Sequence, residues 1–211
     1  MKNNILFITF IVFTSIIICQ DNNRSEKKLK LSDCNETNWQ EYYNSNKKLV
    51  GCDLEGANLK GANLVGANLY SARLKGANLT KANLSGADLS STNLINTVFK
   101  GAMMTSAKLH DALLMKTDFS GAILTGADLS KNRGVWKETV EADFSGAYLE
   151  EANLSDGNFS NSNFNEANLY KANLQRTVLD NANFEKAIIT NAYLGDSQLK
   201  KANLSGANLS M

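Results

Sequence analysis

The side chains able to do chemistry are few in this chain of 211 residues, which contains three cysteines, one histidine and 21 acidic residues. The histidine, His110, is far in sequence from every cysteine, so the Cys and His spacing of a zinc site is absent. The acidic residues are scattered, without a glycine-rich phosphate loop or a Ser-His-Asp motif. We therefore predict no catalytic, metal-binding or cofactor-binding residue, and the remaining chemistry is that of the cysteines.

Cys19 lies at the boundary between an apolar and a polar segment. Residues 5–18 form an apolar run of 14 residues, too short for a comfortable membrane span and typical of a signal-peptide core. A cysteine at this boundary resembles the lipidation site of a bacterial lipoprotein signal, although residues 16–18 are all Ile where the resemblance implies a small residue before the cysteine. We expect residues 1–19 to direct export to the bacterial cell envelope. Lipidation of Cys19, an ordinary cleaved signal and an uncleaved anchor are the three alternatives.

Cys34 and Cys52 remain once Cys19 is assigned to the signal. An even pair of cysteines in an exported protein favours a disulfide, because disulfides persist outside the cytosol. The alternative is that Cys52 fills a small inward position that Ala occupies later in the chain. Both interpretations depend on the element that carries Cys52.

That element is a repeat of five residues. Leu or an equivalent apolar residue recurs 16 times from Leu54 to Leu129 and 14 times from Phe144 to Leu209. A period of five would spread these residues around a helix and over both faces of a strand. The period is compatible with a buried core only if the chain turns once per repeat. Two residues then face inward, the one between them faces solvent, and two form the corner.

The phenylalanines indicate how many repeats close one coil. Phe99 and Phe119 are 20 residues apart, and so are Phe144, Phe164 and Phe184. Like rings would therefore stack in columns if four repeats made one coil. Successive coils would then lie about 4.8 Å apart, the usual distance between strands.

The A-(N/D)-L-x-x pattern resembles the pentapeptide-repeat family over residues 52–129 and 141–209. The resemblance implies an all-β solenoid, a right-handed quadrilateral parallel β-helix. It implies little about function, because solenoid families share an architecture without sharing chemistry. We assign residues 51–211 to this β-helix, with an interruption at about 130–140.

The segments between the signal and the solenoid are expected to serve the solenoid. Residues 20–36 are polar and partly basic, and they form a tether that either stays solvated or touches anionic headgroups. Residues 37–50 are predicted to form a capping helix that begins with a capping box of Asn38 and Glu41. One apolar face of this helix would cover the open end of the β-helix or, alternatively, bind a ligand. Its residues are Trp39, Tyr42 and Tyr43.

The interruption at residues 130–140 contains ten residues, 131–140, that fill the repeat poorly. Either all ten loop out at a corner, which we favour, or they remain in the coil as two degenerate faces. Phe159 shares a column with Phe99 and Phe119 only in the second case. Trp136, inside the interruption, either packs against the coil edge or stands exposed as a partner contact.

The sequence favours an interaction protein over an enzyme. We expect a non-enzymatic rigid rod that binds an unknown envelope protein, is held at the membrane by a lipid anchor and binds no nucleic acid. The alternative is a structural spacer or self-assembling rod. A remote alternative follows from the acidic residues between 138 and 199, because some members of the resembled family mimic DNA and bind topoisomerases.

The last coil of the predicted solenoid offers a further contact. No capping segment follows its repeats in the sequence, so its apolar side chains and backbone edge would be poorly covered. A homodimer through this C-terminal coil would cover them, and the resembled family includes such dimers. The alternative is that the coil frays. The exposed side chains would be Leu194, Leu199, Leu204 and Leu209.

Overall fold

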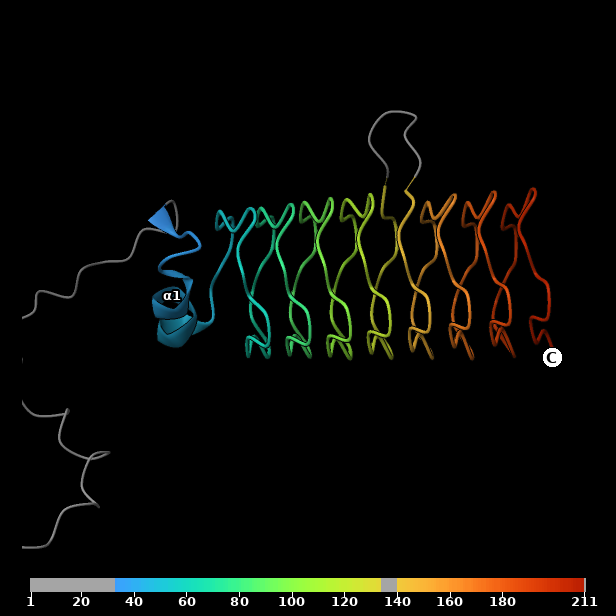
Figure 1. Cartoon of the computed structure of the whole chain (residues 1–211), viewed down its shortest axis with the longest axis horizontal. Helices are drawn as coiled ribbons and strands as arrows, with labels where there is room; N and C mark the ends of the chain where they lie inside the picture. The colour runs from blue at the N-terminus through green and yellow to red at the C-terminus, as the bar shows by residue number, and fades with distance from the viewer. Residues whose placement is uncertain (1–32, 134–139, 211) are drawn as a thin grey trace, which may run out of the picture.

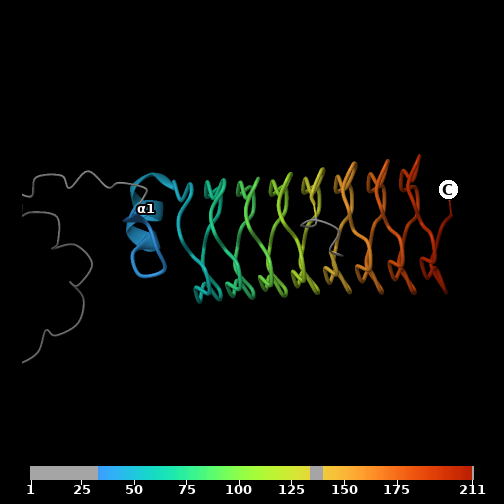
Figure 2. The same ribbon diagram turned by 90° about the horizontal axis from the view of Figure 1, so that it is seen from above.

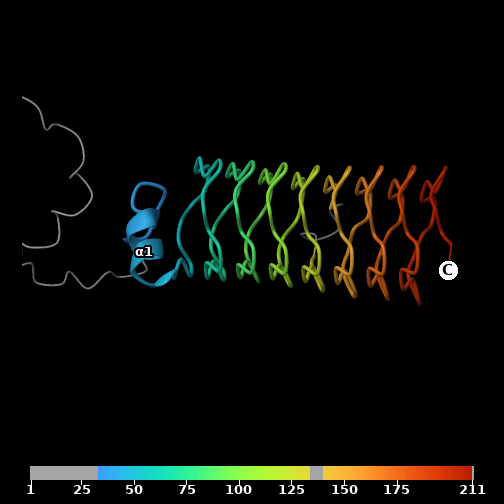
Figure 3. The same cartoon turned by 90° about the horizontal axis from the view of Figure 1, so that it is seen from below.

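The computed structural model describes residues 33–133 and 140–210 and shows a rod of stacked coils with α1, Trp39–Asn46, at its N-terminal end (Figure 1). The coils follow one another along a straight axis, and the C-terminal end of the rod lies opposite α1 (Figures 2 and 3). The expected signal peptide with Cys19, most of the tether and Trp136 lie outside the described residues. No helix within the described ranges is long and apolar enough to cross a membrane.

Each regular coil has four faces and 20 residues. Parallel bridges join residues 20 apart, as from Asn58 to Asn78 and from Asn78 to Val98. The Asn78 N–H donates to the carbonyl of Ala57 over 2.9 Å, and the Leu59 N–H donates to the carbonyl of Asn78 over 2.8 Å. One residue per face is bridged in this way, and the described part of the chain forms no longer strand. The fold is a right-handed quadrilateral parallel β-helix, as predicted.

We number the faces by the bridged residues of the first coil. Face 1 carries Asp53, face 2 Asn58, face 3 Asn63 and face 4 Asn68. The residues that stack on each of these through successive bridges form its column, and every column points outward. A corner is named here by the two faces that it joins.

The repeat separates buried from exposed residues as predicted. Ala57 and Leu59 are 4% and 2% exposed, whereas Asn58 and Lys60 face solvent. Small side chains occupy the Ala position in the regular repeats, because the interior of a four-sided coil holds one large and one small residue per face. Thr97, one of the exceptions to Ala, is also buried, and its hydroxyl donates to the carbonyl of Leu74 over 2.7 Å.

Turn chemistry closes the corners. The N–H of Ala62 donates to the carbonyl of Leu59 over 3.0 Å, which completes a four-residue turn. The second corner residue has a positive φ, and Gly61 adopts its φ of 67° without a steric penalty. The bridged Asn or Asp supports the turn, since Asn68 Oδ1 accepts a hydrogen bond from the N–H of Tyr70 over 3.1 Å. These roles explain why Asn, Asp and Gly recur in the pattern.

A stack of phenylalanine rings, the inward column expected from the sequence, runs through the core behind face 2. Centroids of successive rings lie 4.8–5.1 Å apart, which gives the spacing of the coils directly. Phe159 lies outside this column and meets Phe144 and Phe164 edge-on, at centroid distances of 5.8 and 6.0 Å. The alignment of Phe159 with Phe99 and Phe119, expected only if all ten residues of the interruption stayed in the coil, is therefore absent. The stacked rings are Phe99, Phe119, Phe144, Phe164 and Phe184.

The interruption differs from both predicted alternatives. Bridges across it join residues 25 apart, as from Asp118 to Asp143, so one coil contains five residues more than the others. Arg133 still bridges to Leu113 on face 1, and the regular ladder resumes with Asp143. The ten residues therefore neither loop out entirely nor form two faces. They replace one repeat of face 1 and add five residues to it.

The capping helix is present, but its predicted capping box is wrong. The Asn38 side chain makes no capping hydrogen bond to α1. Its Oδ1 accepts from the N–H of Asn35 over 2.9 Å, and its Nδ2 donates to the carbonyl of Asp33 over 3.0 Å. Asn38 therefore stabilises the turn before α1, which leaves its amide unable to bind the first turn of the helix.

Helix α1 covers the first coil with its aromatic side chains. Trp39 and Tyr42 are buried, at 8% and 4% exposure, and Tyr43 packs half-buried against the core. The Tyr43 hydroxyl also donates to the carbonyl of Val65 over 3.1 Å. This burial supports the capping role over a ligand platform.

A disulfide joins Cys34, before α1, to Cys52 in the first coil. Their Cα atoms lie 4.9 Å apart, and both residues are buried. Cys52 also occupies the inward position that Ala fills in other repeats. The two interpretations of Cys52 therefore describe one arrangement, in which the small inward position also carries the bridge.

Candidate functional site

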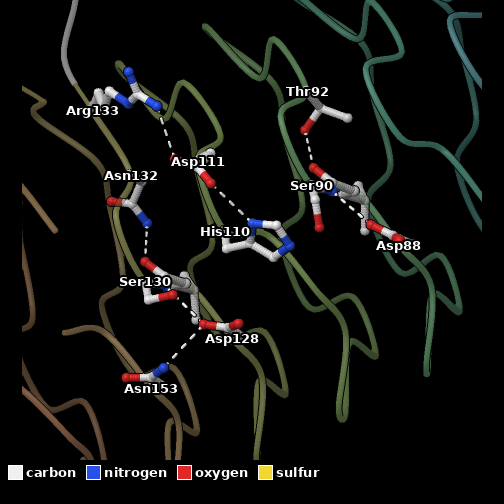
Figure 4. Close-up of polar contacts among 12 residues, drawn as sticks. Asp88, Ser90, Thr92, His110, Asp111, Asp128, Ser130, Asn132, Arg133 and Asn153 are labelled. Atoms are coloured by element: carbon white, nitrogen blue, oxygen red, sulfur yellow. Dashed lines mark hydrogen bonds and ion pairs between the residues drawn. The ribbon is translucent and has the colours of Figure 1, made fainter. Parts of the chain in front are cut away.

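The single histidine lies in a polar cluster at the corner between faces 4 and 1 (Figure 4). His110 Nδ1 is 3.1 Å from Asp111 Oδ2, and Arg133 Nη2 donates to Asp111 Oδ1 over 2.9 Å. The hydrogen bond from Arg133, followed by that from His110, lowers the pKa of the Asp111 carboxyl. Because 70% of the Arg133 side chain is exposed, the ion pair is screened by water and contributes little to stability.

Ser90 lies on the same corner one coil before His110, which places Ser, His and Asp near one another (Figure 4). This juxtaposition does not make a nucleophilic site. Ser90 is 1% exposed, so a substrate cannot reach its hydroxyl, which has no hydrogen-bond partner among the described residues. The nearby backbone N–H groups are also occupied, since Ser91 N donates to His110 O over 3.0 Å. The cluster therefore lacks both access and an oxyanion-binding donor.

A metal site finds no support in the described part of the chain. It contains no group of three or more His, Cys, Asp or Glu residues placed to hold a metal ion. Asn132, at the interruption, fills an inward Ala position and donates through Nδ2 to the carbonyl of Leu129. Asn132 thus takes the place of the Ala that the repeat usually has at this position.

The outer surface offers a different candidate, a stripe of apolar side chains on face 3. Met103, Ile123 and Tyr148 follow one another through bridges in three successive coils. These residues are 42%, 39% and 52% exposed. Exposed apolar residues gathered in one place are typical of binding surfaces. We call these three residues the apolar stripe.

Further exposed apolar residues lie beyond the apolar stripe, toward the C-terminal end and around one corner. Ile188, two coils beyond Tyr148 on face 3, is 42% exposed. Tyr170, on the corner between faces 3 and 4, is 37% exposed, and Tyr193, on face 4, is 59% exposed. Three tyrosines on successive coils thus cross that corner diagonally. Tyr and Met are enriched at protein interfaces, where they supply large contact area.

The rest of the face 3 column shows which residue type the repeat usually carries at these positions. Its other coils carry Asn at positions 63, 83, 168 and 208. On face 2, by contrast, amides stack on one another, with Asn183 Nδ2 donating to Asn163 Oδ1 over 3.2 Å. The apolar stripe therefore replaces a polar residue type that the fold accepts equally well. Folding alone does not require apolar residues at these positions.

Two carboxylates border the apolar stripe at the height of Tyr148. Glu150 accepts hydrogen bonds from Asn168 Nδ2 over 2.6 Å and from Thr125 Oγ1 over 3.1 Å, which hold its side chain in place. Glu151, the next residue, is exposed. Neither glutamate forms an ion pair with a described residue.

The apolar stripe contains none of the site residues that the sequence led us to expect. Cys19 and Trp136 lie outside the described residues, and Cys34 and Cys52 serve the N-terminal cap. The apolar stripe was not predicted. Its signal is present in the sequence as departures from Asn or Asp at bridged positions, but the five-residue insertion hides that Ile123 and Tyr148 stack.

A family model described as pentapeptide repeats matches the chain in eight copies. The matched residues are 48–86, 82–121, 142–181 and 177–210, more than half of the chain. No curated protein matches the chain in sequence.

Several solved structures are similar to this chain. HetL, a pentapeptide repeat protein involved in heterocyst differentiation regulation from Nostoc sp. PCC 7120, is 27% identical over 80% of this chain and 94% of its own, with a TM-score of 0.26. A pentapeptide repeat protein from the Arabidopsis thaliana thylakoid lumen is 31% identical over 54% of this chain and 69% of its own, with a TM-score of 0.36. QnrB1, a plasmid-mediated fluoroquinolone resistance protein, is 17% identical over 74% of this chain and 87% of its own, with a TM-score of 0.47.

Proposed function

This chain belongs to the pentapeptide-repeat family, and we propose that it is a non-enzymatic rod that binds another protein in the bacterial cell envelope. Proteins of this family are generally structural or interaction proteins. The chain would bind through a surface of the rod and would be located at the envelope.

The apolar stripe carries the first part of the proposal. Met103, Ile123 and Tyr148 expose apolar area where the fold accepts Asn, and a protein partner would remove that area from water. The bonded coils form a stiff support beneath these side chains, so binding would require little ordering of the backbone. A protein interface is therefore the best explanation of the stripe.

The N-terminal sequence supports the second part. Residues 5–18 are apolar and Cys19 follows them, as expected for an exported and lipid-anchored protein. Metabolic labelling with a lipid precursor, with Cys19→Ala as the comparison, tests the anchor. Labelled wild type and unlabelled variant are expected, and an unlabelled wild type found in the soluble envelope fraction would contradict lipidation.

Site-specific crosslinking in living cells tests the binding surface. A photoreactive residue at position 123 should crosslink to a defined protein, whereas the same residue at Leu113, on the opposite face, should not. A photoreactive residue at position 103 should form the same crosslink, and Ile123→Asn with Tyr148→Asn should remove it. The matched Leu113→Asn should retain it. Equal crosslinking from positions 123 and 113, or none from either, would favour a spacer over a binder.

A second copy of the chain is a further proposed partner, at the last described coil. Leu204 and Leu209 are 36% and 44% exposed there, and two such coils stacked about a two-fold axis would cover them. The mass of the chain from residue 20 onward, measured in solution with and without Leu204→Lys and Leu209→Lys, tests this. We expect a dimer that both lysines dissociate. A monomer at micromolar concentration, or a dimer that survives the lysines, would refute it.

A further inference from the structure

We propose that the partner docks on face 3 as an amphipathic α-helix that lies along the rod. The apolar side of this partner helix is flanked by basic residues. This inference rests on the proposed function and specifies the partner's chemistry.

The spacing of the coils selects a helix over an extended chain. The coils repeat every 4.8–5.1 Å, as the stacked rings show. One turn of α-helix rises about 5.4 Å, so two turns run only about 1 Å beyond the two steps from Met103 to Tyr148. In an extended chain, residues that share a face are about 6.7 Å apart and fall out of register after one coil. Strand addition to the face is also excluded, because the ladder between coils already uses its backbone groups.

The whole column predicts where the partner helix is apolar. Met103, Ile123 and Tyr148 would meet helix positions i, i+4 and i+7, and Ile188 would meet i+14. Asn168, between Tyr148 and Ile188, would meet i+11. The partner therefore has apolar residues at the four matched positions and a polar residue at i+11.

Charge beside the apolar stripe favours basic flanks. Glu150 and Glu151 border Tyr148 without ion pairs to described residues, so a Lys or Arg on the helix would find two carboxylates there. The tyrosines add a second mode, which Lys171 already illustrates with its Nζ 5.1 Å from the centroid of the Tyr170 ring.

A second copy of this chain fits the same face less well. Two rods packed antiparallel through face 3, about a two-fold axis at Tyr148, would place the Glu150 and Glu151 pairs of both copies at the same height. Four carboxylates gathered at one height disfavour that dimer through like-charge repulsion. A basic helix removes this repulsion, and so the observations favour it.

Synthetic helical peptides test the inference against the full chain held in zwitterionic nanodiscs, with empty nanodiscs subtracted. The first peptide carries Leu at i, i+4, i+7 and i+14, Ser at i+11, and flanking Lys and Arg. The second has the same composition with Leu at alternate positions. The third has the spacing of the first with Glu in place of Lys and Arg. Binding is read from the fluorescence anisotropy of labelled peptides.

We expect the first peptide to bind about tenfold more tightly than the second or the third. Ile123→Asn with Tyr148→Asn should abolish that preference, whereas Leu113→Asn, on the opposite face, should preserve it. Glu151→Gln should reduce the preference for basic over acidic flanks and leave the effect of spacing intact. Glu150 is left unchanged because its hydrogen bonds hold two neighbouring residues.

Two results would overturn the inference. Equal binding of the first two peptides would exclude a helix-spaced contact, and a wild-type dimer dissociated by Ile123→Asn with Tyr148→Asn would identify a second copy as the occupant. A crosslinked partner at position 123 combined with equal peptide binding would leave the proposed function standing and refute the helix. Absence of both crosslink and peptide binding would refute both.

Discussion

At the scale of single residues, the rod depends on side chains that point inward. Leu74 is 0% exposed in the middle of the first half of the rod, while Lys75, the next residue, lies at a corner with 49% of its side chain exposed. Burying a leucine contributes about 1.5–3 kcal/mol, whereas a charge in the same place has no partner and little water. Adjacent positions therefore differ sharply in what they tolerate.

Leu74→Asp should lower the free energy of unfolding by more than about 3 kcal/mol, because it buries an unpaired charge. Lys75→Gln removes only an exposed ion pair with Glu55, 3.7 Å long, and should change the stability by less than about 1 kcal/mol. Urea unfolding followed by circular dichroism measures both. Similar losses in the two variants would show that the inward and outward assignment is wrong.

Gly157 occupies an Ala position where Ala does not fit. A Cβ there would lie 2.7 Å from Phe159 Cε2 and 2.9 Å from the carbonyl of Leu154. Gly157→Ala should therefore destabilise the rod by about 1–3 kcal/mol through overpacking. Gly195→Ala is the matched control, because the nearest atom to its new Cβ, on Gln175, is 3.7 Å away. Thermal unfolding that shows equal losses in both variants would refute the steric explanation.

Asp111 gives the rod a small sensitivity to acid. Hydrogen bonds from Arg133 and His110 lower the pKa of its carboxyl in the folded state. A group with a depressed folded pKa stabilises the protein above its unfolded pKa, about 3.9 for Asp, and loses that effect as the pH falls through the folded pKa. Urea unfolding of Asp111→Asn should therefore show a deficit of less than about 1 kcal/mol at neutral pH that vanishes in acid. A deficit that grows as the pH falls would contradict this sign.

How far residues could be assigned from the sequence depended on whether the repeat constrained them. Leu59, Ala57 and Asn58 were placed correctly because the period of five has one folded solution. Asn38 was misassigned because its amide has several local partners, and only the turn geometry decides among Asn35, Asp33 and the helix N–H groups.

At the scale of elements, the N-terminal cap is the one part of the described rod that is not a repeat. Helix α1 covers the first coil, and the disulfide ties the segment before it to Cys52. The bridge closes a sequence separation of 18 residues, a loop length for which the chain-entropy model gives about 3 kcal/mol. Cap and first coil are therefore expected to open together.

Replacing both Cys34 and Cys52 by Ala should weaken this cap without leaving a large cavity, since Ala is the usual residue at the position of Cys52. We expect a loss of about 2–4 kcal/mol, concentrated in α1 and the first coil. Hydrogen exchange read by mass spectrometry should show faster exchange around Trp39 and unchanged exchange beyond the third coil. Uniform protection in the variant would mean that aromatic packing alone holds the cap.

The elements differ in how well the sequence determined them. A helix near residues 37–50 was predicted, and α1, Trp39–Asn46, is its core. The interruption was predicted, but its form was not, because counting repeats before and after it leaves the number of retained faces open. Only the pairing of Asp118 with Asp143 shows that five residues, and not ten or none, are added to the coil.

At the scale of the whole molecule, a solenoid is stable to the extent that each coil binds its neighbours. The coil with the insertion departs from the regular repeat on one face. Its face 1 places Asn132, with an Oδ1 that lacks a hydrogen-bond partner among the described residues, where other repeats have Ala. The exposed apolar stripe crosses the same coil at Tyr148 on face 3, opposite the insertion. Stability and binding can therefore be separated by editing face 1 alone.

Restoring the repeat should strengthen the rod and leave its binding surface intact. Deleting residues 135–139, with Asn132→Ala and Gly134→Leu, converts the interruption into an ordinary repeat and returns the coil to 20 residues. The new leucine would be buried and the five added residues removed, so urea unfolding should show a gain of about 1.5–3 kcal/mol. A variant that is unfolded or less stable would refute the assignment of five added residues.

The deletion also removes Trp136. A partner crosslink from position 123 that survives it locates binding on face 3, and one that disappears assigns part of the contact to Trp136.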